Sequence, residues 1–134
     1  MTDDRLYFIH IRDTIARIKK FTKGGKDAFL RSDLVQDATI RNLQILTEST
    51  QRLSDGFKRR HPDIDWHGIA GFRNVLVHGY LSLDLNRVWD VVERHASDLK
   101  RKLQDELRSL PSPPKQRRKR LTKKPTRRSK KRKS

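Results

Sequence analysis

Residues 65–79, DWHGIAGFRNVLVHG, predict an amphipathic helix and decide what is expected of the rest of the chain. Asp65 is a residue type that caps helix N-termini, and Gly79 offers a place where the helix can end. Apolar residues at helical spacing predict the buried face: Trp66, Ile69, Ala70, Phe72, Leu76 and Val77. Polar residues interrupt this core-like run and need an explanation: Arg73, Asn74 and His78, followed by Tyr80.

Two segments before this helix carry the same three-and-four spacing of apolar residues. The first covers residues 8–21, with Asp3 and Asp4 as candidate caps, and ends before a pair of glycines. The second begins near Ser32 and ends before Asp55–Gly56. Six residues are expected on its apolar side: Leu34, Val35, Ala38, Ile45, Leu46 and Leu53.

A last segment, beginning near Asp84 and ending near Leu107, completes the set of expected helices. Its apolar residues again repeat at helical spacing: Leu85, Val88, Trp89, Val92, Leu99 and Leu103. No segment alternates between apolar and polar residues as a half-buried strand does. Four helices with short connections predict an all-α fold, an antiparallel four-helix bundle in up-down-up-down order.

The charge of the chain is concentrated at its C-terminal end. Residues 111–134 hold 13 of the 33 Lys and Arg residues and none of the 16 acids, so residues 1–110 carry a net charge of only +4 (20 basic minus 16 acidic). Prolines and this charge density oppose a packed core. We therefore expect a helical domain over residues 1–110 and a disordered basic tail over residues 111–134.

The tail has three competing interpretations. Its cations could bind RNA or ribosomes through counterion release, dock onto an acidic partner, or act only as a solubilising tail. We favour the first, with a first cluster of RNA-binding residues at the start of the tail: Lys115, Arg117, Arg118, Lys119 and Arg120.

Several classes of protein do not fit the composition. The chain has no cysteine, which excludes a disulfide framework. The start, MTDDRLYFIH, is acidic where a secretory signal is basic, and no apolar run approaches the roughly 20 residues that span a bilayer. The five histidines lack metal-ligand spacing, and no glycine-rich phosphate loop is present. We expect a cytoplasmic protein without membrane contact, metal or cofactor.

Helical geometry divides the polar residues of the opening stretch between two faces. At 100° per residue, Asn74 and His78 share a face, whereas Arg73 lies 140° around the helix from His78. Arg73 and His78 can therefore meet in three ways. The helix can loosen near Gly79, the arginine can reach around it, or a second copy of the chain can approach.

These side chains suit the cleavage of RNA without a metal. An imidazole can take or give a proton near neutral pH. A guanidinium binds phosphate and the extra negative charge of a phosphorane, and an asparagine can orient either group. Together they would let a 2′-hydroxyl attack the neighbouring phosphorus, with Tyr80 as a phenol beside the site. The competing interpretation is that Arg73 and His78 are solvated charges near a helix end.

The segment from Trp66 to Val91, WHGIAGFRNVLVHGYLSLDLNRVWDV, resembles the HEPN ribonucleases, specifically HepT-like toxins. The family signature is an arginine, four residues, a histidine, one residue and a tyrosine, which Arg73, His78 and Tyr80 match. Residues 41–49, RNLQILTES, are similar to the family's RNLQIIGEA. The resemblance covers roughly residues 4–108 and leaves out the basic tail.

The resemblance implies a HEPN-like homodimer in which two Arg–His motifs face one another across an RNA-cutting cleft. It further implies a type VII toxin-antitoxin system, whose partner is a nucleotidyltransferase antitoxin similar to MntA. That partner would transfer AMP from ATP to Tyr80 and so place bulk and negative charge where RNA phosphates bind. In this interpretation Arg73 binds phosphate, His78 transfers protons and Asn74 orients.

Two polar residues of the second helix have open roles. Asn42 and Glu48 could support the cleft or orient Arg73, or they could pair with another helix. A non-catalytic alternative also stays open for the whole chain, as a helical adaptor or RNA-binding module that partners a nucleotidyltransferase.

Overall fold

The structure is a computed structural model that describes residues 4–111, apart from the side chain of Tyr80. Over this range every regular element is a helix. The elements are α1 (Asp4–Phe21), α2 (Lys26–Arg31), α3 (Asp33–Gln51), α4 (Asp55–Arg59), α5 (Trp66–His78), the 3-10 turn η1 (Tyr80–Ser82), α6 (Leu85–Asp90), the π-helical turn η2 (Val91–His95), α7 (Ala96–Lys102) and α8 (Gln104–Arg108).

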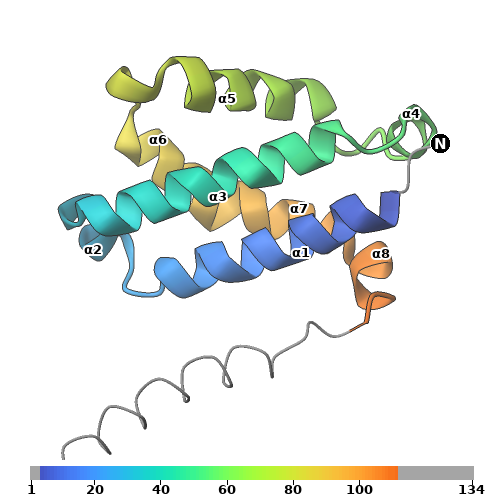
Figure 1. Cartoon of the computed structure of the whole chain (residues 1–134), viewed down its shortest axis with the longest axis horizontal. Coiled ribbons are helices and arrows are strands. Elements are labelled where there is room, and N and C mark those ends of the chain that lie inside the picture. The colour runs from blue at the N-terminus through green and yellow to red at the C-terminus, as the bar shows by residue number, and fades with distance from the viewer. Residues whose placement is uncertain (1–3, 112–134) are drawn as a thin grey trace, which may run out of the picture.

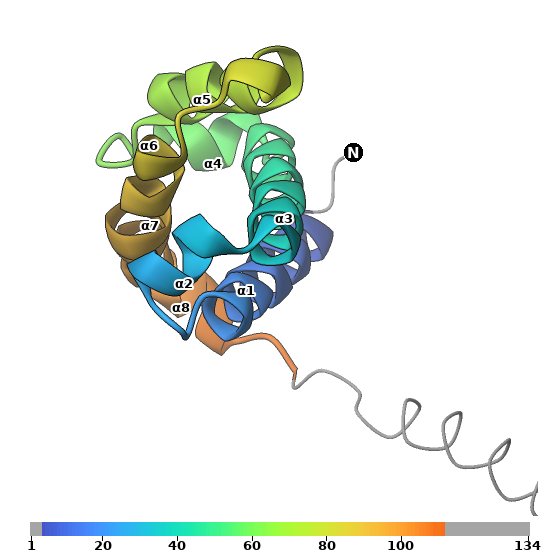
Figure 2. The ribbon, with the colours of Figure 1, turned by 90° about the vertical axis from the view of Figure 1, so that its left-hand side faces the viewer.

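Four helical rods, namely α1, α3, α5 and the rod from α6 to α7, surround one core. Figure 1 shows α3 between α1 and α5, each antiparallel to its neighbour, and the rod from α6 to α7 behind them. Viewed from the end in Figure 2, these helices enclose a common interior, with α2 across it. The predicted all-α fold and its up-down-up-down order are confirmed over the described residues.

Side chains cap three of the helices where the sequence predicts their starts. Ser32 accepts a hydrogen bond from the backbone N–H of Val35 at 3.1 Å. Asp65 accepts one from Gly68 at 2.9 Å, and Asp84 begins α6 in the same way. Asp4 behaves differently, because its carboxylate accepts hydrogen bonds from the N–H and hydroxyl of Ser54 at 2.8 and 2.7 Å. Asp4 therefore joins the start of α1 to the start of α4.

Much of the core comes from the faces that the apolar spacing predicts, but on α3 the buried Ile40 and Leu43 were not among the six residues expected there. Ile11, Leu43, Leu76 and Val88, from four different helices, are fully buried. Buried hydroxyls on α3 bond to carbonyls of their own helix. One example is Thr47, which donates to Leu43 at 3.0 Å. Thr39 is the exception, because its buried hydroxyl has no hydrogen-bond partner among the described residues.

The structure corrects four details of the sequence interpretation. Leu34 and Val77, predicted to be buried, are 79% and 43% exposed, because they lie at the edges of their apolar stripes. The second helix ends at Gln51 and residues 55–59 form the unpredicted α4. The other unpredicted helix, α2, is anchored by the buried Phe29. The last helix is interrupted by η2 and breaks at Leu103.

The predicted basic tail lies almost entirely outside the described residues, which end at Pro111. Its first RNA-binding cluster, Lys115 to Arg120, therefore stays a prediction. Within residues 4–111, no helix is both long enough and apolar enough to cross a membrane.

Candidate active site

The motif arginine is held by a carboxylate on the neighbouring helix. Arg73 projects from α5 toward α3, where its Nε donates to Oε1 of Glu48 at 2.8 Å. The second oxygen of the same carboxylate accepts from Nε of Arg52, also at 2.8 Å. Nη1 of Arg73 additionally lies 3.5 Å from the side-chain oxygen of Asn74. Glu48 thus connects Arg73 of α5 with Arg52 at the C-terminal end of α3.

The two arginines stabilise the ionised form of Glu48. The hydrogen bond from Arg52, followed by the bond from Arg73 and the charges of both, lowers the pKa of the Glu48 carboxyl below its ordinary value, despite partial burial that opposes the shift. Glu48, and after it Tyr7, in turn raises the pKa of the Arg52 guanidinium. The cluster therefore stays a carboxylate between two cations at neutral pH.

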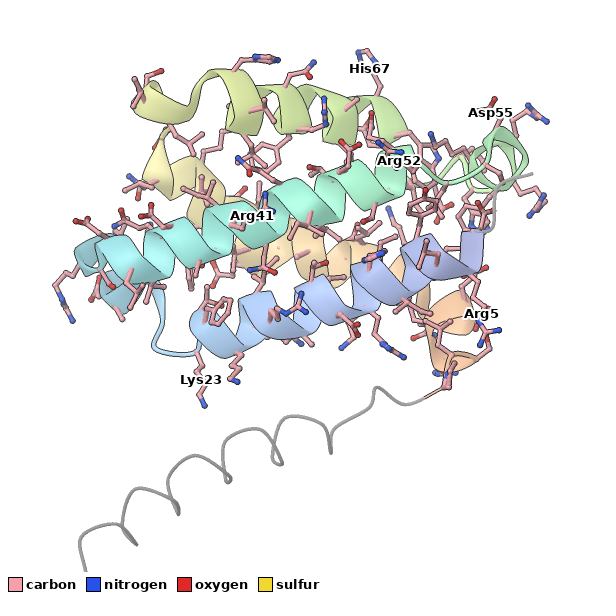
Figure 3. The ribbon with its side chains drawn as sticks, viewed as in Figure 1. Arg5, Lys23, Arg41, Arg52, Asp55 and His67 are labelled. Carbon is pink, nitrogen blue, oxygen red and sulfur yellow. The ribbon has the colours of Figure 1, made fainter. Side chains whose placement is uncertain are left out.

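A groove of about 380 Å³ surrounds this cluster. It is termed the arginine groove here, and its polar lining includes Tyr7 and His10 of α1, Arg41 and Glu48 of α3, Arg52 just after α3, and Arg73 of α5. Figure 3 shows Arg41 and Arg52 along α3, with α5 above them and α1 below. Three arginines against one carboxylate leave the groove electropositive, which suits a phosphate ligand.

The motif histidine faces a different groove, of about 630 Å³. This histidine groove is lined by polar residues of α5, the following turn and α6: Asn74, His78, Ser82, Asp84 and Arg87. His78 is exposed, and Asn74 lies beside it on the same face. Arg87 lies with its guanidinium 5.9 Å from the centroid of the Phe72 ring, against the floor of the groove.

One chain does not bring Arg73 and His78 together. α5 is a regular α-helix through His78 and is capped by Gly79, so it does not loosen before the histidine. Arg73 is bonded to Glu48 in the arginine groove, whereas His78 lines the histidine groove on the other side of α5. Two of the three ways in which Arg73 and His78 could meet do not occur in this chain: the helix does not loosen near Gly79, and the Arg73 side chain does not extend around the helix to His78.

The other predicted site residues differ in how close they lie to these grooves. Asn42 is buried on α3, where its amide donates to the carbonyl of Ala38 at 2.9 Å, and it does not reach Arg73. The backbone of Tyr80 lies in η1, two residues after His78. His67, also on α5, points away from the bundle in Figure 3. No three His, Asp or Glu residues within the described range are grouped so that they could hold a metal ion.

Sequence reasoning missed several residues that line these grooves, among them Tyr7, Arg41, Arg52 and Arg87. A signal for two of them was present. Arg41 and Arg52 stand seven residues before and four residues after Glu48, spacings that place all three on one helix face. That this face lies beside Arg73 required knowledge that α3 packs against α5.

The shifted pKa of Glu48 predicts a dependence of stability on pH. A carboxyl whose folded-state pKa is lowered stabilises the fold above its ordinary value of 4.5, and this contribution is lost as the pH falls through the folded-state pKa. We expect Glu48→Gln to lower the free energy of unfolding at pH 7 by about 1 kcal/mol or less, since the ion pairs of Glu48 are partly exposed. As the pH falls below 4.5, the variant should lose less stability than wild type does.

Urea unfolding at pH 7, 5, 4 and 3 measures this effect. Asp37→Asn is a matched control, because Asp37 is exposed and has no ion-pair partner within the described part of the chain. Parallel stability curves for wild type and Glu48→Gln through the acid range would contradict the prediction.

The fold and the site define the class of protein: it is an all-α bundle in which one helix presents an arginine on one side and a histidine on the other. The family model named Ribonuclease HepT-like matches residues 11–106. The chain belongs to this ribonuclease family, as the resemblance of residues 66–91 predicts. No solved structure matches the chain significantly.

Individual relatives agree with this assignment. A "probable ribonuclease HepT" of Thermococcus cleftensis is 33% identical over 99 residues, which cover 73% of this chain and 90% of the relative. A "Gamma-glutamylcyclotransferase and putative RNase" of Methanocaldococcus jannaschii is 33% identical over 102 residues, covering 75% of this chain but only 46% of the relative. A "putative RNase" of Caldanaerobacter subterraneus is 25% identical over 106 residues, covering 78% and 95%.

Proposed function

We propose that this ribonuclease is the toxin of a type VII toxin-antitoxin system and cuts cellular RNA as a metal-independent endonuclease. One observation carries the proposal. Arg73 and His78 lie on opposite sides of α5 in a single chain, with Arg73 bonded to Glu48. A cleft between two copies can supply an arginine and a histidine to the same phosphate.

Exposed apolar residues beside His78 support a second copy as the missing neighbour. Val77 is 43% exposed and Leu81 is 95% exposed, one residue before and three residues after the histidine. Full burial of such a side chain is worth about 1.5–3 kcal/mol. A homodimer that covers this end of α5 would gain that energy and bring the two motifs near its twofold axis.

The proposed reaction needs only groups that the chain supplies. His78 takes the proton of a ribose 2′-hydroxyl, whose oxygen then bonds to the adjacent phosphorus. The bond from phosphorus to the 5′-oxygen breaks, and that oxygen takes a proton from the protonated His78, which restores the neutral imidazole. The products end in a 2′,3′-cyclic phosphate and a 5′-hydroxyl.

The arginine groove contributes the charge that this step requires. Arg73 binds the phosphate and stabilises the phosphorane as negative charge builds up. Glu48 holds Arg73 toward α3 and acts as a positioning residue. Asn74, beside His78 in the histidine groove, orients the substrate or the imidazole. The test is incubation of the purified protein with cellular RNA in EDTA, followed by detection of cyclic phosphate ends.

Tyr80 is proposed as the control point. A nucleotidyltransferase antitoxin similar to MntA would transfer AMP to it: the phenol oxygen attacks the α-phosphorus of ATP, pyrophosphate leaves, and the phenol proton passes to solvent. The proximity of Tyr80 to His78 in the chain supports this, because an adenylate there adds bulk and negative charge next to the site of RNA binding.

Tyr80→Phe is expected to stay toxic when the antitoxin is co-expressed, because phenylalanine lacks the acceptor oxygen. Bacterial growth measures toxicity, and the mass of the intact protein reports the adenylate. Tyr7→Phe is the matched control and is expected to be adenylated like wild type. Adenylation and silencing of Tyr80→Phe would show that another residue carries the AMP.

The basic tail is proposed to recruit RNA. Deletion of residues 112–134 keeps Pro111, whose carbonyl accepts a hydrogen bond from Arg12, and removes 13 cations. The slope of log affinity against log salt concentration is expected to become shallower by about 0.7 for each lost phosphate contact to single-stranded RNA. Fluorescence anisotropy with a labelled RNA measures the slope. An unchanged slope would remove the tail from RNA binding.

A further inference from the structure

A third groove, of about 500 Å³, lies between α1 and the C-terminal helices α7 and α8. It is termed the basic groove and has five cationic lining residues: Arg12, Lys19, Lys100, Arg101 and Arg108. Its apolar floor consists of parts of Ile15, Ala16 and Leu107. In both Figure 1 and Figure 2, α5 lies on one side of the bundle and α1 with α8 on the other. The basic groove shares no lining residue with the arginine groove or the histidine groove.

The lining of the basic groove contains no carboxylate. Nearby acids neutralise two of its cations, since Arg12 pairs with Asp13 at 2.9 Å and Arg101 pairs with Asp98. The other three cations, Lys19, Lys100 and Arg108, are exposed, and their side chains have no ion-pair partner among residues 4–111. Three positive charges thus converge on one concave surface without compensation.

Helix dipoles explain only part of this arrangement. Lys19, Lys100 and Arg108 lie in the last turns of α1, α7 and α8, where a cation is favourable. That effect acts on each helix separately and does not require cations from three helices to face one groove. Their convergence keeps like charges close together, which costs free energy unless an anion binds there.

We infer that the basic groove binds the phosphate backbone of RNA, as a second contact surface away from the cleavage site. The choice of RNA rests on the proposed function. The chemistry of the surface favours it over a membrane or a protein partner, both of which use large apolar anchors. The exposed large apolar residues of the described chain all lie outside this groove: Leu6, Leu34, Val77 and Leu81.

The described chain ends at the basic groove. Nη1 of Arg12, one of the lining residues, donates to the carbonyl of Pro111 at 2.6 Å. Lys115, the first cation of the tail, follows four residues later in the sequence. The basic groove therefore lies beside the point from which the tail continues.

A remote contact surface affects capture rather than chemistry. RNA bound in the basic groove stays close to the protein, which raises its effective concentration at the cleft. Loss of the groove is therefore expected to raise KM for long RNA and to leave kcat unchanged.

The test compares two triple variants of the full chain with the same net charge. Lys19→Gln, Lys100→Gln and Arg108→Gln neutralise the basic groove. Lys26→Gln, Arg31→Gln and Arg59→Gln are the matched control, because these cations are equally exposed but lie on α2 and α4. The probe is a fluorescent 2′-O-methyl RNA of about 20 nucleotides, which lacks the attacking hydroxyl and is long enough for several phosphate contacts.

We expect the groove variant to bind the probe at least about tenfold more weakly than the control at 0.1 M salt, with a salt slope about 2 smaller, since each lost contact removes about 0.7. Equal affinity and slope in the two variants would overturn the inference. Polyglutamate binding that falls as much as RNA binding would reassign the groove to acidic proteins.

Cleavage assays on the same preparations separate this inference from the proposed function. If wild type binds the probe through the groove but produces no cyclic phosphate, the proposed function fails and the groove stands. If wild type cleaves RNA while the groove variant binds like the control, the groove fails and the proposed function stands.

Discussion

His78→Ala is expected to slow RNA cleavage by about 10²- to 10⁴-fold, the usual contribution of a general acid or base. The fold should survive, because His78 is exposed and its side chain has no hydrogen-bond partner among the described residues. A loss of this size without unfolding would identify the imidazole as the proton-transfer group.

The measurement uses cellular RNA in EDTA, with sequencing of new ends and a test for cyclic phosphates. His67→Ala is the matched control, since His67 lies on the same helix and is also exposed. Equal cleavage by His78→Ala and wild type would remove the histidine from the chemistry. Folded wild-type protein that binds RNA without cutting it would favour the non-catalytic module.

Mixing two inactive variants tests whether the site is shared between copies. A dimer of one Arg73→Ala chain and one His78→Ala chain retains one intact pair if each cleft combines an arginine from one copy with a histidine from the other. Half of the dimers in an equal mixture are mixed, so activity should return to about a quarter of wild type for a twofold-symmetric pair. No recovery after subunit exchange would mean that each chain uses its own pair.

Leu76→Ala is expected to lower the free energy of unfolding by about 2–5 kcal/mol, the range for truncating a buried leucine. Leu76 is fully buried on α5, and its carbonyl accepts a hydrogen bond from Gln44 of α3 at 3.3 Å. The cavity would open where α5 packs against α3, so the melting temperature should fall by about 10 °C or more.

Val77→Ala provides the matched control for this prediction. Val77 is the next residue but is 43% exposed in a single chain, so its truncation should cost much less stability. Urea and thermal unfolding at one fixed protein concentration compare the variants, because a dimer's stability depends on concentration. Equal losses for both variants would mean that Val77 is buried in the assembled protein.

The sequence predicts the long helices well because burial of one face forces apolar residues into a 3.6-residue period. It predicts burial at the margins of these faces poorly, since Leu34 and Val77 fit the period and yet are 79% and 43% exposed. α2 and α4 are too short for a period to be visible. They depend on tertiary contacts through Phe29 and Phe57. In η2, the π-helical turn shifts the register of the last helix, which spacing alone does not reveal.

The candidate site was predictable as far as single-helix geometry extends. The 140° between Arg73 and His78 follows from helical rotation, and the structure keeps them in separate grooves. The pairing of Arg73 with Glu48 was one of two open alternatives, because 25 residues separate them in sequence. Arg52 and Arg87 could not be assigned, since their contribution depends on which helices pack side by side.

Glu48 holds both of its arginines through Nε, which restrains the two guanidinium groups before any substrate arrives. Ordering a long side chain during binding costs about 0.5–1.5 kcal/mol of conformational entropy. For Arg52 and Arg73, part of this cost is met when the chain folds. One carboxylate thus lowers the net positive charge of the groove while pre-organising the cations that remain, so affinity there depends on rigidity as well as on charge.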